Sequence, residues 1–565
     1  MFSILKKSWP WLAAIASGLL EVGCFAPFDQ NWLCWIALTP LIAAVWFSGE
    51  NWKRWWLRNL LLGYLAGIVF FTGTFGWLGA LGDLYQSFFL HGLSFLLSIY
   101  LGLHFAFWSW FIGLIRPQTF TASWRNLLTA LLAAAAWATH EWVRGWLFGG
   151  FGWNGLGVAL HQSWPLIQIS EFTGVVGVSF ALVFVNVIAV TIPLRLFAEA
   201  KTHRMHPHFD LTLTMIGMVA LFAFGLHRAQ NPALAKPLRI AAVQTNIPQS
   251  DKFHPDYAEQ ILNNCDQLSA FAIEREANLG LMVWPESSIP GVFGHDAWVL
   301  QFSQTVAQRS ATDLLLGVDN DENDRAYNAA LLVSPAGESQ LYRKIHLVPF
   351  GEYVPLRHSF PLFAAIASTW VPGDFAAGTQ RTVFHLTDGS IQVAPLICFE
   401  DTVGDLVRHF VLNGADVLAD ITNDGWFLHS AGSQQHLANA VFRCVENRRP
   451  MVRAANTGVT CFIDEFGRRV RATSHIPGEP SRWTNSLQDK TGSAFTRGVL
   501  IGELSVPQEK RLTFYARHGE LFAESCAVVT ALTIAALFGR RWIGRSANAS
   551  AARTDAKPNA ASPRD

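Results

Sequence analysis

Long apolar runs dominate the first 226 residues of the chain, whereas shorter apolar runs alternate with polar stretches from residue 238 onward. A helix needs about 20 mostly apolar residues to cross the hydrocarbon core of a membrane. The first pattern therefore predicts a bundle of membrane helices, and one more apolar run lies near the C-terminus. We expect eight transmembrane helices, at residues 9–28, 32–48, 57–80, 88–115, 125–143, 165–194, 210–227 and 520–539.

The first of these runs has two interpretations. Lys6 and Lys7 precede it, as basic residues precede the apolar core of a cleaved signal peptide. The further runs behind it favour an anchored helix, and cleavage would leave the orientation of the remaining helices unchanged.

The later pattern predicts an α/β domain, because short apolar strands alternate with helix-like stretches. The expected helices cover residues 256–277, 402–413 and 434–447. The expected strands are LRIAAVQTNI (238–247), LGLMVW (279–284), TDLLLGV (312–318), AALLVSP (329–335), SIQVAPLI (390–397), ADVLADI (415–421) and PMVRAANTG (450–458). In open α/β sheets, binding and catalytic residues gather where strands end.

Basic residues occur in alternate loops, which predicts the orientation of the helices. Positive residues stay in the cytoplasm, so both termini are expected there and the α/β domain on the far side, which in a two-membrane bacterium is the periplasm. Arg144 is the only Lys or Arg residue in the loops on the opposite side. The basic loops carry Lys6 and Lys7, then Lys53, Arg54 and Arg58, then Arg116 and Arg125, then Arg195, Lys201 and Arg204, and finally Arg540, Arg541 and Arg545.

Composition supports this division and excludes some classes of function. Residues 1–226 hold 17 of the 23 Trp but only 19 of the 84 charged residues. The chain has 42 Lys and Arg residues and 42 Asp and Glu residues. It therefore lacks the excess of basic residues that would suggest a nucleic-acid partner. We expect a membrane domain at 1–227, an α/β domain at 228–518, and an eighth helix with a cytoplasmic tail at 519–565. The Ala-, Ser- and Pro-rich residues 546–565 are expected to be irregular.

Two strand ends and the polar segment between them carry side chains suited to acyl chemistry. Glu286 follows the strand at 279–284, Cys398 follows the strand at 390–397, and Lys344 lies in the polar segment between them. A free cysteine has a pKa near 8.5, so a base such as Glu286 must remove its proton before it attacks a carbonyl. Lys344 can stabilise the oxyanion that forms, and Glu352 can orient Lys344 or relay a proton.

Each residue taken alone has a less specific interpretation. A lone cysteine after an apolar strand is more often a buried structural thiol, and a lone lysine in a polar loop is usually solvated. The aromatic, glycine-rich loop at residues 144–164 can admit lipid to the site or merely anchor helices. The acids Glu21, Glu141 and Glu171, in or near membrane runs, can be functional or can sit at helix ends.

The chain resembles the bacterial apolipoprotein N-acyltransferases, which are membrane-bound members of the nitrilase superfamily. The segments that carry the resemblance are WPES (284–287), YRKIHLVPFGEYVP (342–355), ICFED (397–401), NDGWF (423–427), RGWLFGGFGW (144–153), RAANTG (453–458) and TFYARHG (513–519). It covers nearly the whole chain, and HLVPFGEYVP beside eight apolar runs is a specific combination.

The resemblance implies a four-layer αββα sandwich beside the membrane bundle, with Glu286, Lys344 and Cys398 as a catalytic triad. Glu352 matches a further acid near the active site. Glu400, Asn423 and Trp426 match positions that line the site or its mobile loops. The family commonly has Tyr after the nucleophile, where this chain has Phe399, so a hydroxyl is lost while the ring is kept.

The resemblance also implies a two-step acyl transfer. Cys398 takes an acyl chain from a phospholipid as a thioester, and the N-terminal amine of a diacylglyceryl lipoprotein then accepts it. The expected enzyme is a monomer of the bacterial inner membrane that needs no cofactor or metal, with histidines such as His346, His436 and His518 structural or substrate-lining. We expect Cys265, Cys398, Cys444 and Cys461 to be reduced.

Two other functions fit parts of the pattern. A membrane-tethered amidase or nitrilase would use the same fold with water as the acceptor, but it would not need seven helices before the domain. A catalytically inactive binding or transport protein would be favoured by the loss of a triad residue, and none is missing here.

Overall fold

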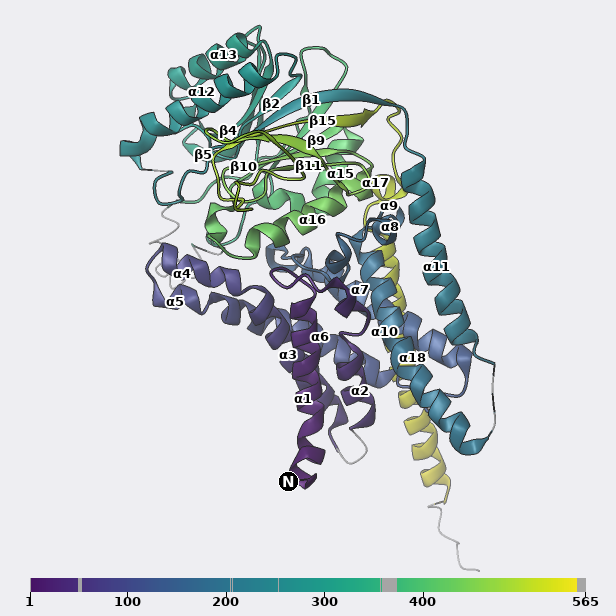
Figure 1. The fold of residues 1–565 in the computed structure, drawn as a ribbon. Coiled ribbons are helices and arrows are strands. Elements are labelled where there is room, and N and C mark those ends of the chain that lie inside the picture. Colours follow the sequence, from purple (N-terminus) through teal and green to yellow (C-terminus); the bar gives the residue numbers. More distant parts are fainter. Residues whose placement is uncertain are drawn as a thin grey trace, which may run out of the picture.

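The computed structural model describes residues 2–48, 53–203, 205, 207–252, 254–355, 357 and 373–555. Its two halves are a bundle of long helices and an α/β domain that lies at one end of the bundle (Figure 1). Helix α1 begins, and helix α18 ends, at the end of the bundle that points away from the α/β domain.

The α/β domain contains two sheets. Within the described residues, the larger sheet has the order β14-β13-β15-β1-β2-β4-β5-β6, and β3 pairs with β4. Its strands are β1 (Ala235–Gln244), β2 (Leu281–Val283), β3 (Val292–Phe293), β4 (Asp313–Glu322), β5 (Arg325–Val333), β6 (Ser339–Arg343), β13 (Ala472–His475), β14 (Arg482–Thr484) and β15 (Gly498–Pro507).

The smaller sheet has the order β12-β11-β10-β9-β8-β7 in the described part of the chain. Strands β8, β9 and β10 run parallel, and β9 is buried along its whole length, as expected for a strand covered on both faces. The strands are β7 (Phe384–His385), β8 (Gln392–Ile397), β9 (Val417–Thr422), β10 (Met451–Ala455), β11 (Cys461–Ile463) and β12 (Arg469–Val470).

The two sheets pack face to face, with β1 against β10 and β15 against β11. Helices α12 (Ala258–Arg275) and α13 (Ala297–Ser310) cover the outer face of the larger sheet. Helices α15 (Gly404–Leu412) and α16 (Gly432–Asn447) cover the smaller sheet, and α16 lies between that sheet and the membrane half (Figure 1). This is the αββα order of layers.

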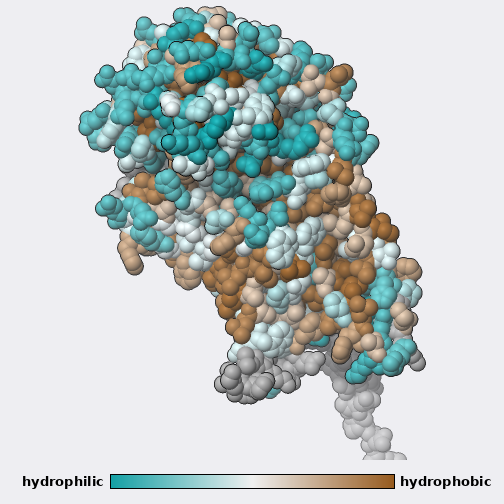
Figure 2. All heavy atoms as spheres, viewed as in Figure 1, coloured by the Kyte–Doolittle hydropathy of each residue, from teal (hydrophilic) through white to brown (hydrophobic). Residues whose placement is uncertain are grey.

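The membrane half is built from long apolar helices, and the chain is a membrane protein. Figure 2 shows hydrophobic residues gathered over this half, and hydrophilic residues over the α/β half. Within the described residues, five helices are long and apolar enough to span a membrane: α3 (Trp55–Thr74), α6 (Leu93–Leu114), α10 (Val175–Thr202), α11 (Phe209–Gln230) and residues 521–540 of α18 (Leu521–Asp555).

Two further helices, α1 (Phe2–Gly23) and α7 (Ser123–Arg144), have 22 residues each but are less apolar. At 1.5 Å per residue each is about 33 Å long, which is enough to cross the hydrocarbon core. The count of eight spans therefore stays a prediction. Short helices α4 (Ala80–Leu84), α5 (Phe88–His91), α8 (Trp164–Ile167), α9 (Ser170–Thr173) and α17 (Phe514–His518) connect the long ones.

Three expectations about helices are wrong in detail. The run at 32–48 is not one helix: a 3₁₀ turn at Asn31–Trp35 precedes α2 (Thr39–Phe47), and Pro40 lies in the first turn of α2. The run at 165–194 is interrupted at Gly174, whose positive φ of 65° ends α9 before α10 begins.

The third difference concerns the C-terminal tail. The backbone of α18 continues to Asp555, where we expected irregular structure from residue 546. Alanine has the highest helix propensity, and the alanine-rich sequence SANASAARTD extends a helix that is already nucleated. Residues 556–565 lie outside the described part of the chain.

Candidate active site

Glu286, Lys344 and Cys398 follow the ends of β2, β6 and β8, and the fold brings them together. Lys344 Nζ lies 3.7 Å from Glu286 Oε1, and both side chains are buried. The Cys398 thiol lies close enough for both charges to act on its pKa. The fold therefore brings a thiol, a carboxylate and an ammonium group close together.

The turn that presents Glu286 depends on close packing against Gly317 in β4. Gly317 N donates to Pro285 O at 3.1 Å, and Ser288 N donates to Gly317 O at 2.9 Å. A Cβ at Gly317 would lie 2.4 Å from Ser287 N and 2.6 Å from Glu286 Cα, so only glycine fits here. The carboxylate of Glu286 is thus placed by backbone contacts with the neighbouring strand.

Glu352 is the closest partner of Lys344. Lys344 Nζ lies 2.9 Å from Glu352 Oε1 and 2.8 Å from Glu352 Oε2. Asn328 links the two acids, since its Nδ2 donates to Glu286 Oε1 at 2.8 Å and to Glu352 Oε1 at 2.9 Å. Burial opposes the charge on Lys344, but the carboxylates of Glu352 and Glu286 outweigh it, and the pKa of Lys344 is raised. Lys344 is therefore a permanently charged group in the site.

Cys398 occupies a strained turn between β8 and the short 3₁₀ helix at Cys398–Thr402. Its φ of 53° lies in the left-handed region, which a residue with a Cβ seldom adopts and which is common at functional sites. Burial, and secondly the charge of Glu286, raise the pKa of the Cys398 thiol well above its usual range, while Lys344 lowers it. The resting thiol thus keeps its proton, and a neighbouring base is needed to form the nucleophile.

Glu400 joins the cysteine turn to the segment that carries Lys344. Its Oε2 accepts from Ile397 N at 3.0 Å, and its Oε1 accepts from Ile345 N at 2.7 Å and His346 N at 3.1 Å. The hydroxyl of Tyr342 donates to the same Oε1 at 2.7 Å. Glu400 is fully buried, so it supports the positions of Lys344 and Cys398 and does not line an open pocket.

Phe399 packs against aromatic residues of the membrane half. Its ring is nearly parallel to Trp153, at 6.1 Å and 11°, and to Phe151, at 6.1 Å and 13°. His346 stacks on the same ring at 5.7 Å. The aromatic loop at residues 144–164 therefore reaches the residue next to Cys398, which favours a role at the site over simple anchoring of helices.

Asn423 and Trp426 have different surroundings. Asn423 is buried, and its side chain bonds Gln249 at 2.7 Å and Asn456 at 3.0 Å, so it holds loops together. Trp426 is partly exposed and stacks on Tyr85 of the membrane half, with ring centroids 6.5 Å apart. Trp426 therefore lies where the two halves meet.

Comparison with known proteins identifies both halves. Residues 17–188 match the family model of the apolipoprotein N-acyltransferase N-terminal domain, and residues 239–479 match that of the carbon-nitrogen hydrolases. The apolipoprotein N-acyltransferase of Geobacter metallireducens is 32% identical over 94% of this chain and 96% of its own length. The chain belongs to the apolipoprotein N-acyltransferase family.

Other known proteins also align with this chain. The apolipoprotein N-acyltransferase of Pseudomonas putida is 31% identical over 93% of this chain and 97% of its own length. Among solved structures, Saccharomyces cerevisiae Nit3, a member of branch 10 of the nitrilase superfamily, aligns at 14% identity and a TM-score of 0.34. That alignment covers 49% of this chain and 92% of the Nit3 chain.

A buried charged cluster behind Cys398 was not expected from the sequence of this family member. Arg453 Nη1 lies 2.7 Å from Asp401 Oδ2, and its Nη2 lies 3.1 Å from Asp424 Oδ1. His436 bridges the same two aspartates, with Nε2 2.9 Å from Asp401 Oδ1 and Nδ1 2.9 Å from Asp424 Oδ1. Burial disfavours the imidazolium, but Asp401 outweighs it and raises the pKa of His436 to about 9. His436 is thus structural, one of the two roles expected for it.

The sequence analysis also did not identify Asn328 as a residue of the site. The signal available was a single amide within the otherwise apolar strand AYNAALLV, and that signal alone does not indicate a partner. Lys252 was missed as well: it is buried, and its Nζ donates to Glu286 O at 2.6 Å. Burial lowers the pKa of Lys252 to about 8.

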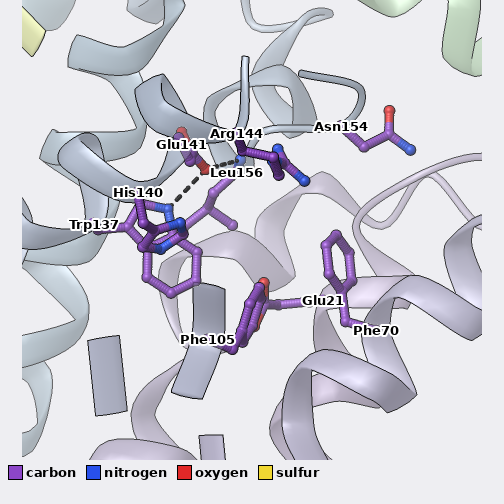
Figure 3. A pocket seen from close by; sticks show the side chains of 9 residues that line it. All are labelled: Glu21, Phe70, Phe105, Trp137, His140, Glu141, Arg144, Asn154 and Leu156. Carbon is purple, nitrogen blue, oxygen red and sulfur yellow. Dashed lines mark hydrogen bonds between the residues drawn. The ribbon is translucent and has the colours of Figure 1, made fainter. Parts of the chain in front are cut away.

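Two of the three membrane acids, Glu21 and Glu141, line one cavity, and Glu171 lies elsewhere. Glu171 pairs with Arg228 and Arg448, so it joins the two halves. Glu141 accepts from Trp137 Nε1 and Leu156 N, each at 2.7 Å (Figure 3). The cavity has a volume of about 10 Å³, room for about one water molecule and too little for a substrate.

Metal binding and the state of the cysteines can be examined in the described residues. No group of three or more His, Cys, Asp or Glu side chains in the described ranges is arranged to hold a metal ion. Cys265, Cys398, Cys444 and Cys461 are all free thiols, as expected.

Proposed function

We propose that this chain is an apolipoprotein N-acyltransferase that moves an acyl chain from a phospholipid to the N-terminal amine of a diacylglyceryl lipoprotein. The observation that carries this proposal is the convergence of Glu286, Lys344 and Cys398 on the side of the α/β domain where the aromatic loop of the membrane half meets Phe399. A soluble substrate would not require a site walled by residues of the membrane half.

In the first step, Glu286 removes the proton from the Cys398 thiol. The thiolate attacks the ester carbonyl of the phospholipid, and the tetrahedral oxyanion is stabilised by Lys344. The intermediate collapses by breaking the ester C–O bond. The departing alkoxide takes the proton from Glu286 and leaves as a lysophospholipid, so the enzyme holds one acyl chain as a thioester.

In the second step, the neutral α-amine of the lipoprotein attacks the thioester carbonyl. Lys344 again stabilises the oxyanion, and the nitrogen loses a proton to the carboxylate of Glu286. The C–S bond breaks, and the Cys398 thiolate recovers that proton. The products are an N-acylated lipoprotein and free enzyme, with no net redox change. Glu352 holds Lys344 in place throughout, which its two short contacts support.

We further propose a monomer of the bacterial inner membrane, with eight spans and the α/β domain in the periplasm. The change from the helical bundle to the two sheets after α11, and back to a helix at α18, supports a division at residues 1–227, 228–518 and 519–565. The start of α1 and the end of α18 lie away from the α/β domain, which supports this orientation (Figure 1). The concentration of Lys and Arg in alternate loops supports it as well.

The test is the intact mass of the purified protein after incubation with dioleoyl phosphatidylethanolamine. We expect a gain of one oleoyl group in the wild type and in Cys461→Ala, a matched buried cysteine, and no gain in Cys398→Ala. A diacylated lipopeptide should discharge the adduct and acquire the acyl chain. Discharge by water alone would indicate a hydrolase, and a folded wild type without an adduct would refute the proposal.

A further inference from the structure

Helix α16 contacts the membrane half near both of its ends, and the two contacts differ in kind. Figure 1 shows α16 lying directly above the membrane helices. Gln435 is in the first turn, and Arg448 caps the C-terminus. At 1.5 Å per residue these positions are about 20 Å apart along the helix. They can therefore be altered independently.

The contact at the first turn is centred on the side chain of Gln435, which uses both ends of its amide. Its Oε1 accepts from Trp77 Nε1 at 3.1 Å, from Trp153 Nε1 at 3.2 Å and from Asn154 Nδ2 at 2.9 Å. Its Nε2 donates to Ala26 O at 2.8 Å and to Thr74 O at 3.0 Å. Gln435 is 2% exposed, so its partners would have no access to bulk water if the amide were lost.

The indoles that Gln435 holds form a wall beside the cysteine turn. Trp153 is nearly parallel to Phe399, the residue that follows Cys398, and it stacks on His436 with centroids 5.1 Å apart. Trp77 lies against Trp153 at 5.3 Å and meets Phe427 edge-on at 4.7 Å. A shift of Trp153 would therefore be transmitted to the backbone next to Cys398.

The loop that carries Trp153 has a second attachment. Glu141 Oε1 accepts from Leu156 N at 2.7 Å, just beyond the aromatic residues (Figure 3). Arg144 O accepts from Phe151 N at 2.8 Å. These bonds fix the base of the loop to α7. The hydrogen bonds to Gln435 fix its aromatic part to the α/β domain, and so they set its position relative to Cys398.

The contact at the other end of α16 holds the halves together without reaching the cysteine turn. Gln168 Nε2 donates to Phe466 O at 2.9 Å, and Arg448 Nη1 donates to Gln168 Oε1 at 2.5 Å. Arg448 also pairs with Glu171 at 2.7 Å. Gln168 is as buried as Gln435, so it is a matched glutamine in the same interface.

We propose that Gln435 is a positioning residue for the acyl transfer, which keeps the Trp77–Trp153 wall of the membrane half in register with Cys398. This inference rests on the proposed function. A glutamine suits the position because one side chain must both accept from indole N–H groups and donate to backbone carbonyls. Misplacement of reacting groups by about 1 Å can slow a reaction about 100-fold, so loss of this register should act on the rate.

The experiment compares Gln435→Met with Gln168→Met, because methionine has nearly the length of glutamine but cannot replace its hydrogen bonds. Single-turnover formation of the Cys398 thioester is measured at saturating dioleoyl phosphatidylethanolamine, with thermal stability in the same detergent. We expect Gln435→Met to react at least about 10-fold more slowly than Gln168→Met at similar stability. The phospholipid concentration at half-maximal rate should change less than the maximal rate.

Alkylation of Cys398 by iodoacetamide separates positioning of the wall from damage to the triad. The rate in Gln435→Met should stay within about 2-fold of the wild type, because Glu286 and Lys344 are untouched. Trp153→Phe is a milder second variant, which keeps a ring beside Phe399 but removes one donor to Gln435. It should lower the maximal acylation rate about 3-fold.

Equal acylation rates in Gln435→Met and Gln168→Met would overturn the positioning role while leaving the proposed function intact. A parallel loss of alkylation in Gln435→Met would also overturn it, because the effect would then run through the triad. A folded wild type that forms no adduct would refute both proposals. If Gln435→Met does not fold, the maximal acylation rate of Trp153→Phe tests the positioning role instead.

Discussion

The ammonium group of Lys344 lies 2.9 Å and 2.8 Å from the two oxygens of Glu352. Glu286 stands further away, with Oε1 at 3.7 Å, and its Oε2 has no hydrogen bond among the described residues. The two acids therefore contact Lys344 differently, and this difference suits two separate roles. In the proposed mechanism, Glu352 keeps Lys344 charged and in place, and one oxygen of Glu286 is left to exchange a proton with the thiol.

Replacement of Glu352 by Gln should slow formation of the Cys398 thioester by about 10- to 100-fold. The amide removes the charge that holds Lys344, so the ammonium group moves toward Glu286 and engages the proposed base. The measurement is single-turnover acylation followed by intact mass.

The matched control for this change is Glu322→Gln. Glu322 pairs with Arg343 at 2.7 Å, one residue before Lys344, but it is half exposed to solvent. An exposed ion pair is screened by solvent and adds little to stability, so this variant should acylate at the wild-type rate. Equal rates in the two variants would contradict the holding role of Glu352.

Phe399→Tyr should retain acylation within a few-fold of the wild type, because the ring can keep its parallel contacts with Phe151 and Trp153. Phe399→Ala removes the ring from this stack, and loss of a buried phenylalanine costs about 3–5 kcal/mol of stability. We therefore expect a lower melting temperature and slower acylation in Phe399→Ala. Wild-type rates in Phe399→Ala would show that the stack is dispensable.

Gly317→Ala should lower the acylation rate at least about 10-fold by displacing the turn at Glu286, in line with the effect of small misplacements. The new Cβ would lie 2.4 Å from Ser287 N, closer than any real Cβ contact. Gly539→Ala is the control, because a Cβ there meets nothing within 4 Å. The maximal rates of the two purified variants are compared, and a fully active Gly317→Ala would contradict the proposed packing.

Stability should fall as pH rises through about 9, owing to His436. The folded-state pKa of about 9 exceeds the unfolded value near 6.5, so the imidazolium stabilises the fold below pH 6.5 and loses this effect as pH approaches and passes 9. The loss between pH 7 and 9.5 is roughly 2 kcal/mol.

Melting temperatures of the wild type and His436→Gln between pH 7 and 9.5 test whether the charge on His436 stabilises the fold. Lys252, whose pKa is lowered to about 8, contributes the opposite slope, but it is present in both proteins and cancels in their difference. The gap between the two melting temperatures should narrow as pH rises. A constant gap would mean that His436 does not carry the charge.

Local sequence patterns were enough to locate the long apolar helices and to name the candidate residues at strand ends. Run length and hydropathy are local properties, so α3, α6, α10 and α11 lie near the predicted ranges. Glu286 and Cys398 could be named because each follows an expected strand, and Lys344 because it lies in the polar segment between those strands. Their catalytic roles remain predictions.

The surroundings of these residues depend on the tertiary fold. The partners of Gln435 include Ala26, more than 400 positions earlier, and Asn328 meets Glu286 across 42 positions. No local pattern encodes such distant hydrogen bonds. The break at Gly174 likewise followed from backbone conformation, which hydropathy does not report. A buried polar side chain signals that a partner exists, and the fold determines which one.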